Sequence, residues 1–252
     1  MNAAAKLIIT ILSIVTVIAI ITGVYIHVFR GYGFRTASKS VEGCEELEGE
    51  VTSIDFDVDF ADVKIAYGDT FAVSYSMPEN LVPKVNIKDG VLSVKSTQTT
   101  NFSFPFNVSG DYEIVLTLPE GTELDDLTMN IDAGDITVKG IKATNLNMDV
   151  DAGDIKLSDI EADNFQIDVD AGNFEINGVN VQRMTVDVDA GNIDIRDSVI
   201  GTITADIDAG NIESHNSTIS GGNCEVDMGN ISLNGEIGDV KVKASLGNAS
   251  VN

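Results

Sequence analysis

The sequence is short of positive charge. Only 15 lysine and arginine residues accompany 40 aspartate and glutamate residues. No acidic residue precedes Glu42, whereas four basic residues do, so the remaining chain holds 11 basic against 40 acidic residues, a formal net charge of −29. A polyanion of this kind repels nucleic acid and anionic lipid. The composition therefore excludes nucleic acid as a partner and favours cations or basic proteins.

Cysteine and histidine are also scarce, with two of each. Cys44 and Cys224 form no CxxC motif and no lipid-attachment site, and a disulfide between them is an open alternative. His215 has no serine or cysteine constellation around it, and no phosphate-binding glycine loop is present. We therefore predict no catalytic and no cofactor-binding residue, and we do not expect an enzyme.

One long apolar run lies near the N-terminus. Residues 7–28, LIITILSIVTVIAIITGVYIHV, contain no charge. As a helix rising about 1.5 Å per residue they would span about 33 Å, roughly a bilayer core. We therefore expect a transmembrane anchor over residues 1–30 and a juxtamembrane linker over residues 31–50. A cleaved signal peptide is the alternative, although its apolar region is usually shorter.

The orientation of this anchor follows less directly. Lys6 flanks the run on one side, and Arg30, Arg35 and Lys39 flank it on the other, which favours a cytoplasmic body by charge counting. The acidity, the few cysteines and the repetitive β pattern of the body are more typical of an outer surface. We expect a single-pass protein of the cell membrane whose C-terminal body is extracellular, with a cytoplasm-facing body as the alternative.

A phrase rich in carboxylates recurs in the second half of the chain. The pattern D-A-G-D/N-I/F returns every 19 residues, and two variants, DMGNI and SLGNA, follow it. Its copies begin at Asp132, Asp151, Asp170, Asp189 and Asp208. A strict period of this length indicates a solenoid, in which each unit buries its apolar face only when the next unit stacks on it.

Within a unit, apolar and polar residues alternate with period two. In LNMDVDAGDIKL the apolar face of Leu146, Met148 and Val150 resumes at Ile155 after the A-G-D step. Glycine beside aspartate or asparagine is typical of a corner. We predict an all-β fold, a parallel β-helix or β-roll solenoid of about 19 residues per coil over residues 127–252, preceded by one N-terminal transmembrane helix.

Residues 51–126 carry weaker versions of the same alternation. Asp89-Gly90 between two alternating runs predicts a hairpin. DFADV, residues 59–63, resembles a divergent copy of the corner phrase. We expect an N-terminal β cap that is continuous with the solenoid, and a separate domain is the alternative.

The chain as a whole resembles a known family. The apolar N-terminal run, SIDFDVDFADVKI, VNIKDGVLSVKS, YEIVLTLPEG and the tandem DAGDI are similar to those of bacterial membrane-anchored β-strand-repeat proteins. These are called "putative adhesins" and contain a domain of unknown function. Members more often have Ser or Thr where this chain has Ala in D-A-G-D. The resemblance implies the fold and an adhesin-like role, but it brings no catalytic residues.

Stacked coils would arrange equivalent residues in columns. An inner column would hold Met129, Met148, Ile167, Val186, Ala205 and Cys224, and a corner column would hold Asp135, Asp154, Asn173, Asn192, Asn211, Asn230 and Asn248. Two outer columns would hold Asn130, Asp149, Asp168, Asp187, Asp206 and Glu225, and Asp132, Asp151, Asp170, Asp189, Asp208 and Asp227. We expect the inner and corner columns to be structural, the corner as a ladder of amide hydrogen bonds.

The outer columns would place like charges about 4.8 Å apart, at a cost of about 0.9 kcal/mol per pair in bulk water. Screening, raised pKa values or a divalent cation would each relieve this repulsion. Calcium suits the pattern because it takes several oxygen ligands, although the Gly-Gly-x-Gly-x-Asp calcium repeat is absent. The candidate calcium ligands are Asp149, Asp151, Asp168, Asp170, Asp187, Asp189, Asp206 and Asp208.

We interpret the chain as a membrane-tethered, acidic β-solenoid that acts as a non-catalytic, adhesin-like binding or scaffold module at the cell surface. Its partners would be the membrane, through the N-terminal helix, and an unidentified protein or envelope component. One alternative is a cytoplasm-facing accessory protein of an envelope-stress or regulatory system. Another is a calcium-stabilised surface protein, with calcium as its only cofactor.

Overall fold

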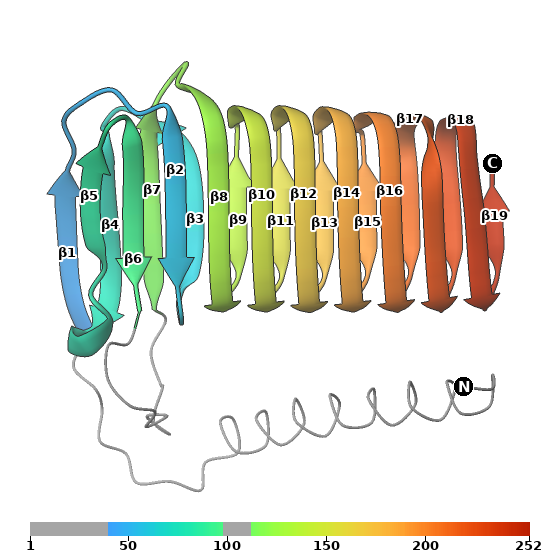
Figure 1. Ribbon diagram of the computed structural model, residues 1–252, viewed down its shortest axis with the longest axis horizontal. Helices are drawn as coiled ribbons and strands as arrows, with labels where there is room; N and C mark the ends of the chain where they lie inside the picture. Colours follow the sequence, from blue (N-terminus) through green and yellow to red (C-terminus); the bar gives the residue numbers. More distant parts are fainter. Residues whose placement is uncertain (1–39, 98–111) are drawn as a thin grey trace, which may run out of the picture. The chain divides into compact units, whose positions relative to one another are not determined.

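The computed structural model describes residues 40–97 and 112–252, which form an all-β body with one 3-10 turn, η1 (Glu79–Leu81). The repeats build coils of two strands each, a long strand in one layer and a short strand in the layer behind it (Figure 1). The long strands are β8 (Glu123–Ala133), β10 (Lys142–Ala152), β12 (Glu161–Ala171), β14 (Asn180–Ala190) and β16 (Val199–Ala209). The short strands are β9 (Ile136–Lys139), β11 (Ile155–Ser158), β13 (Phe174–Asn177) and β15 (Ile193–Arg196).

The last coils are formed by three strands. They are β17 (Ile212–Met228), β18 (Ile231–Leu246) and β19 (Ala249–Val251), of which β17 and β18 continue from the short layer into the long one. Successive coils pair in parallel and in register, as Met148 with Ile167 and Asp149 with Asp168 show. The predicted parallel solenoid with 19 residues per coil is thereby confirmed.

The N-terminal part of the body shares these two layers. Its strands are β1 (Ser40–Glu46), β2 (Ser53–Val58), β3 (Asp62–Gly68), β4 (Ala72–Pro78), β5 (Lys84–Lys88), β6 (Val91–Ser96) and β7 (Glu113–Pro119). β2 and β3 pair in parallel with β8 and β9. β6 and β7 pair with the other edges of β2 and β3, so the spatial order differs from the chain order. Antiparallel strands β5, β4 and β1 complete this end.

Two local predictions in this part are confirmed. Asp89 and Gly90, with φ of 52° and 80°, form the turn of the hairpin between β5 and β6. Asp62 occupies the corner position of a coil, because its Oδ1 accepts a hydrogen bond from the backbone N–H of Asp135 at 2.9 Å. β1 corrects one expectation: it lies within residues 31–50, but it pairs with β4 and belongs to the sheet rather than to a linker.

The structure does not test the expected membrane anchor. Residues 7–28 lie outside the described residues. Within residues 40–97 and 112–252, no helix is long and apolar enough to cross a membrane.

The core is a set of apolar columns between the two layers. Met148, Ile167 and Val186 follow one another in register, each at most 3% exposed. Cys224 continues their column, fully buried, and burial raises the pKa of its thiol to about 12. Both cysteines are free, with Cys44 exposed on β1, so the alternative of a disulfide is wrong. Cys224 is therefore an unreactive core residue, as predicted.

Close approach between coils explains the corner glycines. A Cβ on Gly172 would lie 1.8 Å from the carbonyl oxygen of Gly153, and one on Gly191 would lie 1.6 Å from that of Gly172. Neither Gly172 nor Gly191 has a left-handed φ. The sequence suggests that these glycines are needed for their backbone conformation. That explanation is incomplete, because contact with the preceding coil also forbids any side chain here.

The corner column forms the expected hydrogen-bond ladder. The side-chain Nδ2 of Asn192 donates to Oδ1 of Asn173 at 2.9 Å, and that of Asn211 donates to Oδ1 of Asn192 at 2.8 Å. Each backbone N–H of the column also donates to the preceding side chain, at 3.1 Å for Asn211. Asp154 accepts both bonds from Asn173, but gives no side-chain donor to Asp135. Asp135 and Asp154 therefore occupy the positions of the ladder at which the side chain only accepts hydrogen bonds.

We expect Asn192→Asp to destabilise the fold by about 1–2 kcal/mol, because it removes a donor and sets a carboxylate against Oδ1 of Asn173. Asp154→Asn is the matched control, since it adds a donor facing Oδ1 of Asp135 and should leave stability unchanged or increased. The midpoint of urea unfolding measures both. Equal losses in the two variants would contradict the ladder.

Candidate functional site

The eight predicted calcium ligands lie together on the outer side of the long strands. Asp149, Asp168, Asp187 and Asp206 pair in register across β10, β12, β14 and β16. Two positions further along each strand, Asp151, Asp170, Asp189 and Asp208 form a parallel column, and all eight are exposed. We call the surface of these eight residues the acidic face. The structure thus brings every candidate residue into one two-column array.

Lysines end the first of these columns, a feature that the sequence reasoning missed. Asp57 pairs with Lys95 at one end, and Glu225 pairs with Lys243 at the other. The Nζ of Lys95 lies 3.3 Å from Asp57 and 3.4 Å from Asp55, and Lys243 forms an ion pair with Glu225. Lys243 lies 18 residues after Glu225, and the same shorter spacing, which separates DMGNI from SLGNA, would have found it. Lys95 could not be found from the repeat, because β6 joins the stack on the far edge of β2, outside the order of the chain.

The acidic face holds its negative charge at a cost. The pKa values of Asp168, Asp187 and Asp206 are raised, first by partial loss of hydration against the packed strands and then by neighbouring carboxylates. The same two causes raise the pKa values of four residues in the second column, Asp132, Asp170, Asp189 and Asp208. Repulsion between stacked carboxylates, expected from the sequence, is therefore present in the folded protein.

The array has the form of rows rather than of a preformed ion site. Within the described part of the chain, no group of three or more histidine, cysteine, aspartate or glutamate side chains converges as metal ligands do. A calcium ion on the acidic face would have to bridge carboxylates of adjacent coils, with water completing its shell. Calcium binding stays a prediction.

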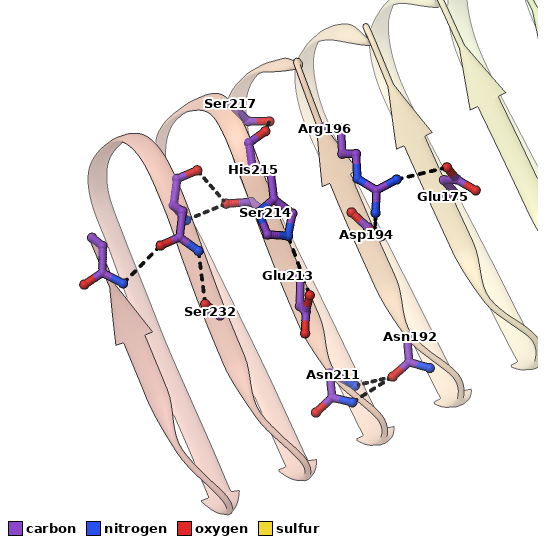
Figure 2. A network of polar contacts seen from close by, with 12 residues as sticks. Glu175, Asn192, Asp194, Arg196, Asn211, Glu213, Ser214, His215, Ser217 and Ser232 are labelled. Atoms are coloured by element: carbon purple, nitrogen blue, oxygen red, sulfur yellow. Dashed lines mark hydrogen bonds and ion pairs between the residues drawn. The ribbon is translucent and has the colours of Figure 1, made fainter.

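A second polar cluster lies on the short-strand layer (Figure 2). Arg196 contacts Asp194 and, at 3.4 Å, Glu175. His215 is half exposed, with Nε2 3.6 Å from Glu213. The hydroxyl of Ser214 bonds instead to the backbone of Asn234, at 3.0 Å from its N–H. His215 is thus a surface residue, as predicted, and this serine is not poised against it as a nucleophile would be.

A shallow depression of about 230 Å³ lies at the beginning of the long strands, whereas the acidic face lies near their ends. Ala143 and Ala162 line it where other coils carry larger residues such as Val181 and Ile200. Its polar rim includes Glu123, Lys142, Thr144, Glu161, Asp163 and Gln182. The acids of this rim lie beside amides and a lysine, without a histidine or a cysteine among the lining residues.

The raised pKa values predict an unusual response to acid. A carboxyl group whose folded pKa exceeds its unfolded value binds more protons when folded, so stability falls as pH rises through that window. The melting temperature should therefore rise as pH is lowered from 7 towards the ordinary aspartate value of 3.8. Combining Asp168→Asn, Asp187→Asn and Asp206→Asn should raise the melting temperature at pH 7 and flatten its pH dependence.

Thermal unfolding followed by circular dichroism between pH 7 and pH 4 tests this. Glu79→Gln in η1, outside the columns, is the matched control and should keep the native slope. A melting temperature that falls on mild acidification, with the same slope in the triple variant, would contradict the proposed repulsion.

Calcium should stabilise the protein beyond simple screening. We expect millimolar calcium to raise the melting temperature by about 5 °C at constant ionic strength, because an ion that binds only the folded state adds to its stability. Sodium chloride at matched ionic strength should have a smaller effect. Combining Asp168→Asn, Asp170→Asn, Asp187→Asn and Asp189→Asn should abolish the difference. An unchanged melt with calcium and with chelator would eliminate the calcium hypothesis.

Several solved structures are similar to this chain at low sequence identity. A "putative adhesin" from Bacteroides fragilis superposes with a TM-score of 0.58 at 16% identity, covering 86% of this chain and 99% of that chain. A "putative adhesin" from Parabacteroides distasonis gives 0.49 at 15% identity, covering 85% and 98%. A "putative cell adhesion protein" from Clostridium sporogenes gives 0.43 at 13%, covering 84% and 99%. The first of these likenesses supports the fold alone.

No curated protein matches the chain. The Toastrack DUF4097 family, a domain of unknown function, matches residues 51–252, which include β2 to β19 and the whole acidic face. The family resemblance seen in the sequence is confirmed, and the chain belongs to the Toastrack DUF4097 family.

Proposed function

We propose that this protein is a non-catalytic binding or scaffold module, tethered to the membrane by residues 7–28 and displayed at the cell surface. The observation that carries the proposal is the acidic face. Four consecutive coils repeat the same pair of exposed aspartates in register. A surface of this kind attracts cations or a basic protein and repels other polyanions.

The fold does not require these acids. The next outer column of the same strands is neutral, although it faces solvent in the same way. It consists of Thr128, Asn147, Gln166, Thr185, Thr204 and Asn223. Neutral side chains therefore satisfy the outer side of this sheet without repulsion. A role in binding would explain why the protein retains aspartates that lower its stability.

Repetition would make the face multivalent. Each coil offers the same carboxylates at the same spacing, so a basic partner with several charges can engage several coils at once, and each contact raises the effective concentration for the next. Such binding would be fast and strongly dependent on salt.

Catalysis fits this array poorly. Acid–base chemistry by paired carboxylates needs two environments that separate their pKa values. Asp168 and Asp170 have pKa values that are raised by the same causes, and no coil singles out one pair. A binding role uses the equivalence of the coils, whereas an active site needs one of them to differ.

Binding at the acidic face can be tested with the full chain in detergent micelles as bait for envelope extracts, with and without calcium. The native chain should retain basic proteins that are released by salt. Combining Asp168→Asn, Asp170→Asn, Asp187→Asn and Asp189→Asn should lose most of them, at least tenfold. Glu236→Gln, remote from the columns, is the matched control. Identical recovery by native chain and quadruple variant would refute the proposal.

Protease treatment of intact cells tests the display. Cleavage of the body without lysis is expected for an extracellular solenoid. Protection until lysis would instead support a cytoplasm-facing accessory protein.

A further inference from the structure

Among the strands of residues 40–97 and 112–252, β18 is the last of the long-strand layer. β18 pairs with β17 along most of its length, while its pairing with β19 involves only Ile231, Ser232 and Leu233. Residues 237–246 therefore have one paired edge, and no strand of the described chain covers the other. A row of unpaired backbone N–H and C=O groups of this kind is a template for an added strand.

The apolar core is open at the same place. Val242 stacks on Cys224, and Ala244 on Val226, but both are only half-buried, whereas Cys224 and Val226 are fully buried. Leu246, the last residue of the strand, is 57% exposed. Another strand carrying apolar residues at alternate positions would complete the burial that the preceding coils achieve.

The outer side of this edge carries Asp239 followed by two lysines. Lys241 and Lys243 follow Asn223 and Glu225 of the preceding coil. Lys243 has an ion pair with Glu225, while no ion pair of the described chain involves Lys241. At the opposite end of the layer, Lys95 makes the same kind of contact with Asp55 and Asp57 of the adjacent strand. A lysine row beside an acidic row is thus a contact that this structure already forms twice.

These charges disfavour a second copy of the chain as the added strand. The other edge of the long layer, β5, carries Lys84 and Lys88. Head-to-tail stacking would therefore set lysines against lysines, and tail-to-tail stacking would oppose β18 to itself with the same result. Like charges on directly opposed strands are destabilising.

We propose that the free edge of β18 is a docking site for an extended segment of a partner protein with alternating apolar and acidic residues. The segment adds as the next strand through backbone hydrogen bonds. Its apolar residues cover Val240, Val242 and Ala244, and its acids contact Lys241 and Lys243. This edge is separate from the acidic face, so the inference stands whether or not that face binds a partner.

The probe is a fluorescent peptide with the sequence of residues 144–152, TNLNMDVDA, which has the required alternation. Anisotropy with the full chain in detergent micelles should show saturable binding that salt weakens. Lys241→Glu with Lys243→Glu should weaken it at least tenfold. The peptide with Asp149→Lys and Asp151→Lys should bind poorly to the native chain, but better than the acidic peptide to this double variant.

Lys84→Glu with Lys88→Glu, at the opposite edge, is the matched control and should bind as the native chain does. Lys241→Glu alone disturbs no ion pair among the described residues, so it tests the edge with Lys243 and Glu225 still paired, and it should weaken binding severalfold. Absence of binding to the native chain, or binding that neither substitution at β18 changes, would overturn the proposal. So would sedimentation showing that the native chain self-associates through this edge.

Discussion

The structure depends on parallel backbone hydrogen bonding between residues one period apart. This ladder extends through the corners as well as the strands, as the bonds from the N–H of Ile136 to Asp154 at 2.9 Å and of Phe174 to Asn192 at 2.8 Å show. Because the register is the same from coil to coil, each side chain lies between its own equivalents above and below. An interaction between equivalent residues at one position is therefore repeated from coil to coil along the stack.

Contact of like with like has different consequences in different parts of the coil. In the interior it places apolar residues on apolar residues, which is favourable. At the corner it places amide on amide, and Asn192 both accepts from Asn211 and donates to Asn173. On the outer side it places aspartate on aspartate, where partial loss of hydration and then repulsion from neighbouring carboxylates raise the pKa of Asp187. Only the outer columns oppose the stacking, and these are the columns that a binding role explains.

A repetitive stack must also end, and the two ends differ. At the N-terminal end, β4 and β5 turn antiparallel and β1 is added beyond β4, so the row of parallel strands is closed by hairpin-type pairing. At the C-terminal end the last long strand keeps the parallel arrangement and leaves its edge and apolar residues uncovered. Lysines mark the last rows at both ends, so stacking of a second copy of the same chain would set lysines against lysines.

The sequence by itself determined the repeat, its period, its corner, the inner column of Met148 and Cys224 and the outer columns of aspartate. These follow from periodicity alone, because a strict repeat in a parallel stack leaves one register that buries every apolar residue. Only the tertiary structure decided that Lys95 ends an acidic column, that β8 stacks on β2, and that contact with the neighbouring coil excludes a side chain at Gly172. Those facts depend on which segments meet in space, and no local pattern encodes a contact between strands whose spatial order departs from their order in the chain.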